Sequence, residues 1–387
     1  MTSNLSSVNL GSIATFRAGY AFPKKDQGNG DGEVPFIKVS DFNIPGNEIR
    51  ILIANNYVSE EYVKERKLKT FPAGTIVFAK IGVALLSDRI RILTQPTLID
   101  NNLMGCIARR VNEKYLSCVL EQTHLSRYAD GSALPFLKQS TIEQVSVDVF
   151  SDAIQNRIGN FMNSLDMKIE VNNRIISNLE KQLTCLFDKK CTTNEQQGFD
   201  NMSLSDIATF TNGLAMQKFP PESEDEFLDV LKIRELRQGC LDENSDKCSV
   251  NIDERFKVKD ADIIFSWSGS LMVDIWTGGL CGLNQHLFKV TSNNYPKWFV
   301  YLWVKHHVAD FAAIAAEKAT TMGHIKRSDI DKAKVVVPNK DAMGTLNKLF
   351  APMYELLVQI KMQNKKLSKI RVFLLPKLLS GEVKLNN

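Results

Sequence analysis

The residue types that could support chemistry in this chain form two small clusters, a histidine pair and a glycine-rich loop. His306 and His307 are adjacent, so on a helix their side chains point about 100° apart and cannot bind one metal ion together. We expect a surface or partly packed pair. Residues 28–32 (Gly-Asn-Gly-Asp-Gly) suggest a phosphate-binding loop, but no helix signal follows, and Val34 and Pro35 begin a strand. We therefore interpret this loop as a flexible turn.

Motifs for base modification and nucleotide hydrolysis are missing from the sequence. An adenine methyltransferase needs an Asn/Asp-Pro-Pro-aromatic loop to hold a flipped base, whereas the double proline Pro220-Pro221 follows Phe219. There is no Gly-x-x-x-x-Gly-Lys-Ser/Thr segment and no compact His/Cys/carboxylate cluster. The seven cysteines include no Cys-x-x-Cys pair, which argues against disulfides and zinc and favours a reducing cytoplasm. We expect no catalytic site, no metal and no cofactor.

Composition indicates an ordinary globular protein of two domains. The chain has 387 residues, 44% hydrophobic and 24% charged. Its net charge is only +4, so a nucleic-acid site would have to be a local patch. The N-terminus lacks the pattern of a signal peptide, and no apolar run approaches the ~20 residues of a membrane span. We expect a cytoplasmic protein.

The sequence contains an internal duplication. Residues 10–21 and 204–215 are identical at seven of twelve positions, at an offset of 194. Three further pairs of segments correspond at similar offsets: 36–39 with 230–233, 75–82 with 262–269, and 137–142 with 325–330. A period near 190 residues is too long for a solenoid repeat. It predicts two related domains in a pseudo-symmetric molecule.

Each copy has the same predicted order of elements: short strands, a helical stretch, a last strand and a long helix. The predicted strands are 34–40, 75–80 and 103–110, then 228–233, 261–267 and 285–291, and the helical stretches are 113–127 and 297–316. We predict an α+β fold with two pseudo-symmetric α/β domains, 1–150 and 191–340. Two long antiparallel coiled-coil helices within 151–190 and 341–387 would join them.

The two long helices carry the clearest periodicity. Apolar residues alternate at spacings of four and three with one polar interruption, a heptad pattern sustained over about four repeats. The residues expected to pair are Ile158, Met162, Leu165, Ile169, Asn172, Ile176, Leu179 and Leu183, and Leu349, Met353, Leu356, Ile360, Gln363, Leu367, Ile370 and Leu374. An offset of 191 relates these two sets. Each helix could instead pack only on its own domain, but two matched copies favour mutual pairing.

The polar interruptions predict a register. Asn172 and Gln363 are the midpoints of the two stripes, and antiparallel helices around a two-fold axis keep their midpoints level. We therefore expect their side chains to be in contact. A buried polar pair there would cost stability but fix register and orientation.

This layout resembles the specificity subunit of type I restriction–modification systems, over essentially the whole chain. The segments that carry the resemblance are the openings at Leu10 and Leu204, residues 138–142, 265–271, 284–290 and 323–330, and the closing Leu-Leu-Pro-Lys-Leu-Leu-Ser-Gly-Glu at 374–382. The resemblance implies two target-recognition domains, each followed by one of the paired helices. It also implies a non-catalytic subunit that directs other subunits to a bipartite, asymmetric DNA sequence.

The partners that the resemblance implies are double-stranded DNA, two methyltransferase subunits docked on the helices, and restriction or translocase subunits. A helix of about 29 residues would be ~43 Å long, against ~34 Å for one turn of DNA. The helices could therefore set the distance between two half-sites.

DNA reading needs side chains that reach base edges and cations that contact phosphates. The candidates in the first domain are Arg17, Lys24, Lys25, Lys38, Lys80, Arg89, Arg91 and Lys138. In the second they are Lys218, Lys232, Arg234, Arg237, Trp267, His286, His324, Lys326 and Arg327. The alternative for each cation is a solvated surface charge, and for Trp267 and His286 a place in the core. Lys38 with Lys232 and Lys138 with Lys326 are favoured because the duplication retains both members.

Two other functions remain open from the sequence alone. A coiled-coil scaffold that binds only protein would show no salt-dependent DNA affinity. A self-contained methyltransferase or nuclease is disfavoured by the missing motifs, and methyl transfer by the purified chain alone would support it.

Overall fold

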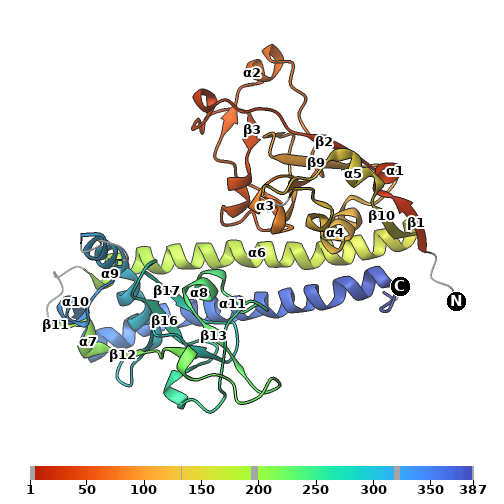
Figure 1. The fold of residues 1–387 in the computed structure, drawn as a ribbon. Coiled ribbons are helices and arrows are strands. Elements are labelled where there is room, and N and C mark those ends of the chain that lie inside the picture. The colour runs from red at the N-terminus through yellow and green to blue at the C-terminus, as the bar shows by residue number, and fades with distance from the viewer. Residues whose placement is uncertain (1–4, 132, 193–198, 318–322, 386–387) are drawn as a thin grey trace. The chain divides into compact units, whose positions relative to one another are not determined.

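The protein is described here by a computed structural model, which covers residues 5–131, 133–192, 199–317 and 323–385. Within these ranges, helices and strands alternate along both halves of the chain (Figure 1). None of the described helices is both long enough and apolar enough to cross a membrane.

The chain forms two compact units. Unit 1 contains Met1–Arg174 together with Leu367–Asn387, and unit 2 contains Ile175–Lys366. Two long helices, α6 (Asp152–Cys191) and α11 (Lys340–Ser380), contribute residues to both units. Unit 1 therefore combines the predicted segment 1–150 with one part of each long helix.

Unit 1 is built around two small sheets and one strand pair. The larger sheet has the order β2 (Ala14–Ala18), β9 (Leu103–Ala108), β6 (Ile76–Ala79), β7 (Ile90–Leu93) and β4 (Arg50–Ile51). The smaller has the order β5 (Tyr57–Val58), β3 (Val34–Ile37) and β8 (Leu98–Ile99), and β1 (Leu5–Asn9) pairs with β10 (Ser146–Phe150). The helices are α1 (Leu10–Ile13), α2 (Glu60–Glu65), α3 (Val83–Leu86), α4 (Glu113–Thr123) and α5 (Gln139–Gln144).

Unit 2 repeats this plan. One sheet has the order β12 (Thr209–Asn212), β19 (Leu287–Thr291), β16 (Ile263–Ser266) and β17 (Met272–Ile275). The other has the order β14 (Lys247–Cys248), β13 (Leu228–Leu231), β18 (Cys281–Leu283) and β15 (Lys257–Val258), and β11 (Asp200–Ser203) pairs with β20 (Lys334–Val337). The helices are α7 (Leu204–Ile207), α8 (Ile233–Gln238), α9 (Lys297–Glu317) and α10 (Arg327–Lys332).

The hydrogen bonds of the two units match as closely as their strand orders. Leu10 N donates to Val145 O at 2.9 Å, and Leu204 N donates to Ala333 O at the same distance. β3 runs parallel to β8 just as β13 runs parallel to β18. The predicted α+β fold with an internal duplication is confirmed, and the predicted strands and helical stretches coincide with observed elements apart from their ends.

The two long helices correspond at an offset of 188 residues, not the expected 191. Buried positions that differ by 188 include Met162 and Phe350, Asp166 and Tyr354, Ile169 and Leu357, and Phe187 and Leu375. The expected offset was wrong by three residues because heptad positions alternate at spacings of three and four. A shift of three residues still places one apolar position on another, so the pattern alone could not reject it.

In unit 1, the first part of α6 packs antiparallel against the end of α11. Ile158 and Met162 share a buried cluster with Leu375 and Leu378. Further along α6, Asp166 meets Arg371, so rising numbers in α6 match falling numbers in α11. The clustered leucines anchor the last turns of α11 to the body of unit 1.

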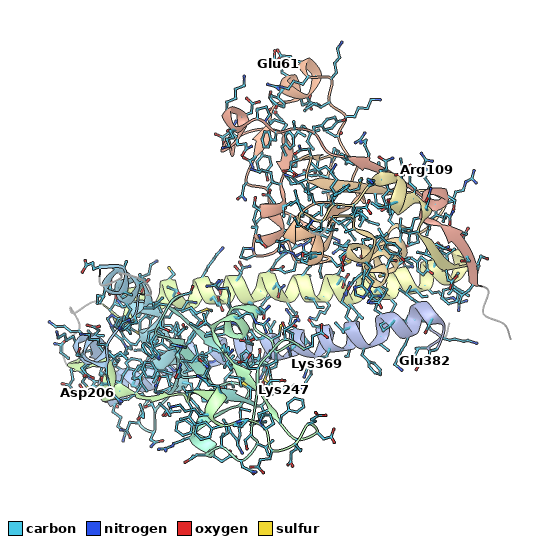
Figure 2. The ribbon with its side chains drawn as sticks, in the orientation of Figure 1. Glu61, Arg109, Asp206, Lys247, Lys369 and Glu382 are labelled. Atoms are coloured by element: carbon cyan, nitrogen blue, oxygen red, sulfur yellow. The ribbon has the colours of Figure 1, made fainter. Side chains whose placement is uncertain are left out.

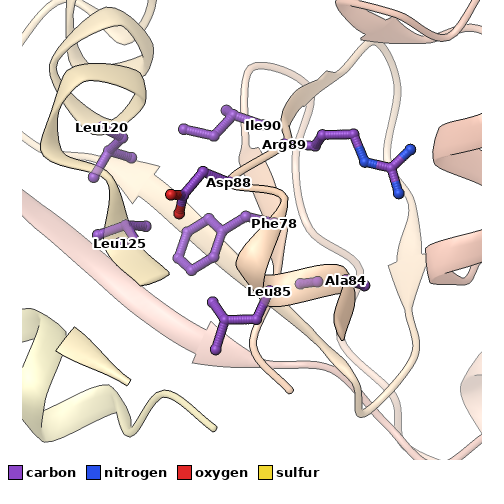
Figure 3. Close-up of a pocket in the computed structure, with 9 residues that line it drawn as sticks. Phe78, Ala84, Leu85, Asp88, Arg89, Ile90, Leu120 and Leu125 are labelled. Carbon is purple, nitrogen blue, oxygen red and sulfur yellow. The ribbon is translucent and has the colours of Figure 1, made fainter. Parts of the chain in front are cut away.

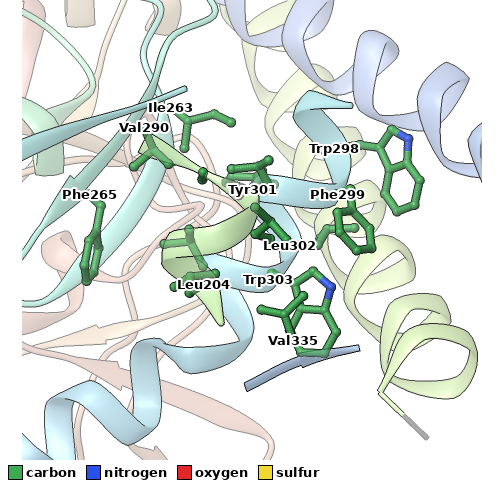
Figure 4. Packing of buried hydrophobic residues seen from close by; sticks show 14 of the residues in the cluster. Leu204, Ile263, Phe265, Val290, Trp298, Phe299, Tyr301, Leu302, Trp303 and Val335 are labelled. Atoms are coloured by element: carbon green, nitrogen blue, oxygen red, sulfur yellow. The ribbon is translucent and has the colours of Figure 1, made fainter. Parts of the chain in front are cut away.

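In unit 2, the second part of α6 packs beside the first part of α11 around α9. Leu183 and Phe187 share a buried cluster with Phe350 and Leu357. Several consecutive residues of α9 are buried in the same cluster, which Figure 4 shows around Trp298, Phe299, Tyr301, Leu302 and Trp303. Because consecutive residues of a helix point in different directions, this run of apolar residues means that α9 is buried on more than one side.

The residues expected to pair lie at different depths. Ile158, Met162, Ile169, Leu179 and Leu183 of α6 are buried. Asn172 is also buried, and Leu165 and Ile176 are half-buried. In α11, Met353, Ile360, Leu367 and Leu374 are half-buried, whereas Leu349, Leu356, Gln363 and Ile370 are exposed. The expected contact between Asn172 and Gln363 joins the two units and stays a prediction.

Both long helices exceed the expected 29 residues. α6 has 40 residues and α11 has 41, which corresponds to about 60 Å each. The sequence pattern marked only the apolar stripe. The turns beyond the stripe continue both helices and also bury apolar side chains, among them Phe187 and Cys191 of α6 and Leu378 of α11.

Candidate nucleic-acid interface

Charge alone does not single out an interface, because charged side chains cover both units. Figure 2 shows this for Glu61 and Arg109 in unit 1 and for Asp206 and Lys247 in unit 2, all of which are exposed. The duplicated backbone, however, brings several candidate residues together at one place in each unit.

In unit 1, three segments meet at the end of β6. Lys80 N donates to Asn102 O at 2.9 Å, and Leu137 N donates to Lys80 O at 2.8 Å. Gly82 N donates to Pro135 O at 2.7 Å, and its φ of +72° is one that favours glycine. We call residues 80–82, 100–102 and 135–138 corner 1.

In unit 2, the same three bonds recur at the end of β16. Trp267 N donates to His286 O at 3.4 Å, and Ile325 N donates to Trp267 O at 3.2 Å. Gly269 N donates to Gly323 O at 3.0 Å, and the φ of Gly269 is +65°. We call residues 267–269, 284–286 and 323–326 corner 2.

The side chains of corner 2 form a cluster of aromatic rings and hydrogen-bonding groups. The Trp267 ring lies 6.0 Å from His286 and 6.3 Å from His324, between ring centroids. Trp267 Nε1 donates to Asn212 Oδ1 at 3.1 Å, and Ser268 Oγ lies 3.1 Å from His286 Nδ1. His324 is exposed and Trp267 half-buried, so the cluster is open to a ligand on one side.

Corner 1 has different side chains on the same backbone. Lys80 occupies the position of Trp267, Asn102 that of His286, and Phe136 that of His324. Lys138 Nζ lies 5.3 Å from the Phe136 ring centroid and 3.1 Å from Asp130 Oδ2. Lys138 and Phe136 are both exposed.

Lys38 and Lys232, the pair retained by the duplication, flank the corners. Each begins a short helix, and its backbone N–H donates to a buried carboxylate three residues later, Asp41 at 2.7 Å and Glu235 at 3.1 Å. Lys38 Nζ also donates to Gln27 Oε1 at 2.7 Å, and Lys232 forms an ion pair with Asp246. The shared backbone hydrogen bond shows that Lys38 and Lys232 occupy equivalent positions in the two units.

Two of the candidate arginines use their guanidinium groups inside the protein. Arg17 donates to the carbonyl oxygens of Lys69 and Thr70 at 3.0 Å and stacks over Phe71 at 3.8 Å. Arg91 is 8% exposed and donates to Phe42 O at 3.3 Å. Burial lowers the pKa of Arg91 to about 10. These contacts give both residues a structural role.

The remaining candidate cations lie at or near the surface, and several already have protein partners. Arg234 contacts Glu235 and Asp242, and Arg237 donates to Ser270 Oγ. Arg89 donates to Asn43 Oδ1 at 2.6 Å. The exposed candidates without a direct part in the core are Lys24, Lys25, Lys218, Lys326 and Arg327.

The sequence prediction missed Asn102 and Phe136, which share corner 1 with Lys80 and Lys138. Aligning the copies at offsets of 184 and 188 would have found them opposite His286 and His324. Among the residues the structure describes, no group of three or more His, Cys, Asp or Glu could hold a metal ion.

The comparisons with known proteins agree with this duplicated architecture. The family model described as "Type I restriction modification DNA specificity domain" matches residues 3–181 and 196–367. The MjaIX specificity subunit of Methanocaldococcus jannaschii is 26% identical, covering 91% of this chain and 87% of its own. The HindI specificity subunit of Haemophilus influenzae is 22% identical over 48% of this chain and 42% of its own.

One solved structure has a similar fold over nearly the whole chain. The type I restriction–modification S subunit from M. genitalium is 13% identical, with a TM-score of 0.61 and coverage of 97% of this chain and 96% of its own. Both curated relatives are named specificity subunits of type I restriction enzymes, which agrees with the expected DNA-specificity role. The chain belongs to the type I restriction–modification DNA specificity family.

Proposed function

We propose that the chain reads a bipartite, asymmetric DNA sequence, with corner 1 reading one half-site and corner 2 the other. The observation that carries this proposal is that one backbone arrangement occurs twice with different side chains. An asymmetric split site needs two readers that are placed alike and differ only in what they recognise. Lys80, Asn102 and Lys138 would act in corner 1, and Trp267, His286, His324 and Lys326 in corner 2.

The types of these side chains fit base reading. Lysine donates to guanine O6 and N7, asparagine pairs with adenine, and histidine can donate or accept at base edges. Exposed cations near the corners, such as Lys326 and Arg327, would contact phosphates and position the protein. Arg17 and Arg91, whose guanidinium groups are bound internally, are left out of this proposal.

Methyltransferase subunits would dock on the long helices. The exposed large apolar residues of α11 are Leu349, Leu356, Ile370, Val372 and Phe373. Val372 and Phe373 are 68% and 63% exposed, an unfavourable arrangement for a helix that faces only water. Replacing both by serine should weaken assembly with the methyltransferase without changing which DNA sequence is recognised. Restriction subunits would join this complex, and the cytoplasm is where DNA and these partners meet.

The decisive experiment is to map modified bases in the source cells with the chain present and deleted. A split motif carrying a modified adenine should disappear on deletion. Exchanging residues 1–150 for another recognition domain should then change one half of that motif only. A change in both halves would contradict independent reading by the two corners.

A protein-binding scaffold remains the alternative function, supported by the exposed apolar residues of α11. The two functions differ in their response to salt. A DNA reader that contacts several phosphates loses affinity steeply as salt rises, whereas a scaffold has no such affinity to lose. DNA binding by the complex at several salt concentrations separates them.

A further inference from the structure

Exposed apolar side chains lie within and next to corner 1. Val83 is 81% exposed, Leu134 58%, Leu86 55% and Phe136 37%. Val83 and Leu86 belong to α3, and Leu134 and Phe136 to the segment 133–136. We call these four residues the apolar patch.

The backbone holds the patch in place. Asp130 and Phe136 exchange two backbone hydrogen bonds, of 2.8 and 2.9 Å, which close the turn that carries Leu134. Gly82, the residue before α3, donates to Pro135 O, and a Cβ built on it would lie 3.8 Å from Leu134 Cδ1. Leu134 therefore lies beside the start of α3, next to Val83.

The helix under the patch is anchored in the core. Leu85 of α3 is buried and faces a small pocket that Phe78, Leu120 and Leu125 also line (Figure 3). Asp88, just after α3, accepts hydrogen bonds from Ser126 N at 2.8 Å and Ser126 Oγ at 2.6 Å. Val83 and Leu86 are therefore displayed by a helix that is anchored in the core, and exposed apolar side chains grouped on a surface indicate a binding role.

Unit 2 has a polar residue at the place of Val83, whereas the place of Leu134 falls outside the described residues. After Gly269 the chain has Ser270, which accepts from Arg237, and it continues into β17 without a helix. Trp267 there is turned to Asn212 by a hydrogen bond. The two corners thus share a backbone, and the segments that follow Gly82 and Gly269 differ: α3 with its exposed Val83 in unit 1, and Ser270 in unit 2.

We propose that Val83 and Leu134 contact the 5-methyl groups of thymines in the half-site read by unit 1. Thymine is the base that presents a methyl group in the major groove, and apolar side chains recognise it by contact. Lys80 and Lys138 of corner 1, and Arg127 from the segment that Asp88 binds through Ser126, supply positive charge for the DNA backbone beside the patch, although Lys138 is shared with Asp130. This inference rests on the proposed DNA-reading function and adds the type of base edge that the first domain recognises.

The test removes the methyl groups from the DNA and leaves the protein intact. The complex of the chain with its methyltransferase subunits is titrated with duplexes carrying the mapped target sequence. In one duplex uracil replaces every thymine of the first half-site, and in another every thymine of the second. We expect the first replacement to weaken binding about three- to five-fold per methyl contacted, and the second to have less than a two-fold effect.

Substitutions on the protein complete the test. The Val83→Ser, Leu134→Ser double variant should bind the thymine duplex about as weakly as the unmodified protein binds the uracil duplex. It should also show no further loss on uracil, because the partner of each methyl is already gone. Leu280→Ser removes an exposed apolar side chain in unit 2, 49% exposed, and serves as the control that keeps full thymine sensitivity.

Several outcomes would overturn the inference while the proposed function stands. One is unchanged binding when uracil fills the first half-site. Another is an equal loss from uracil in either half-site. A third is a serine double variant that binds DNA normally but no longer assembles with the methyltransferase, which would make the patch a protein-docking surface. Failure of the complex to bind any split site would instead count against the proposed function itself.

Discussion

The two units hold their helix junctions together by different means. In unit 1, Arg371 of α11 contacts Asp166 of α6 at 2.7 Å and Glu121 of α4 at 2.6 and 2.7 Å. Lys114 also forms an ion pair with Asp166, which is fully buried. Although burial opposes ionisation of Arg371, these carboxylates raise its pKa above the usual range.

In unit 2, two of the corresponding positions are apolar or aromatic, and the ion pairs lie elsewhere: Lys361 of α11 contacts Glu180 of α6 at 3.2 Å and also pairs with Asp274. At an offset of 188, Tyr354 replaces Asp166 and Leu183 replaces Arg371, and both are buried. At the offset of 184 that relates α4 to α9, Lys305 of α9 takes the position of Glu121 of α4. Its Nζ lies 3.7 Å from Glu180 Oε2. A duplicated junction has thus kept its backbone and changed its chemistry.

The difference bears on which helices can pair. A buried ion pair adds little net stability, but either partner alone is costly because it leaves a buried charge uncompensated. If α6 paired with a second α6, Leu183 would face Asp166. If α11 paired with a second α11, Arg371 would face Tyr354. The difference between the two junctions therefore favours pairing of α6 with α11 over pairing of like with like.

The largest effect on this comparison should come from Arg371→Met. The change removes the guanidinium group that Asp166 and Glu121 share, and breaking a buried ion pair in this way costs about 3–5 kcal/mol. Lys114 still accompanies Asp166, so we expect the lower end of that range in urea unfolding. Adding Asp166→Asn should recover part of the loss. Simple additivity of the two changes would show that the residues are not coupled.

A smaller loss is expected from Leu183→Ala in the apolar junction. Leu183 is fully buried, and truncating such a leucine costs about 3 kcal/mol through lost burial and an unfilled cavity. The matched control is Leu280→Ala in the same unit, at an exposed position, where the free energy of unfolding should change by less than ~0.5 kcal/mol. Equal effects of the two changes would contradict a tightly packed junction.

Tyr354→Phe should be neutral or stabilise the protein by up to ~1 kcal/mol. The Tyr354 hydroxyl is buried and has no hydrogen-bond partner among the described residues, so removing it relieves a desolvation cost. Tyr301→Phe is the comparison, because Lys305 Nζ lies 3.4 Å from the Tyr301 hydroxyl. A clear loss of stability in Tyr354→Phe, measured by thermal unfolding, would mean that the hydroxyl is satisfied after all.

The smallest effect concerns pH. Burial lowers the pKa of His307 in α9, and its Nε2–H donates to Lys334 O at 2.9 Å, with Asp310 and His306 as titratable neighbours. The folded state favours the neutral imidazole, so the unfolded state binds more protons once the pH falls below ~6.5. This contribution to stability is complete above that pH and is lost below it. In His307→Gln, the free energy of unfolding should therefore depend less on pH between pH ~5 and ~6.5 than in the unmodified protein. An unchanged pH dependence would show that His307 is not its source.

The sequence predicted the architecture because duplication and heptad spacing are local patterns. Residues 10–21 and 204–215 match position by position, and the apolar stripe marks both long helices. The sequence could not determine the offset in residue number between equivalent positions of α6 and α11, because a shift of three residues also superposes apolar positions. Phe350 and Leu357 are buried, whereas Leu349 and Leu356, which the pattern favoured, are exposed.

The candidate site was predicted only in part, because exposure depends on contacts between distant segments. Nothing near Arg91 in the sequence indicates that Phe42 O will accept from its guanidinium. Likewise, Lys80, Asn102 and Phe136 come together only through bonds between strands and turns far apart in the chain. Trp267 and His286, candidates for which a place in the core was the alternative, are half-buried in an open cluster.

Because the end of α11 belongs to unit 1, the N-terminal unit cannot be completed until the C-terminal helix has been synthesised. Arg371 lies 205 residues after Asp166 and 250 after Glu121, so its carboxylate partners leave the ribosome long before it. At a synthesis rate of about 5–20 residues per second, on the order of ten seconds or more separate the synthesis of Asp166 from that of Arg371. A nascent or truncated chain therefore exposes the carboxylate of Asp166 and the leucine-binding face beside it. Unit 1 can therefore be complete only after α11 has been synthesised.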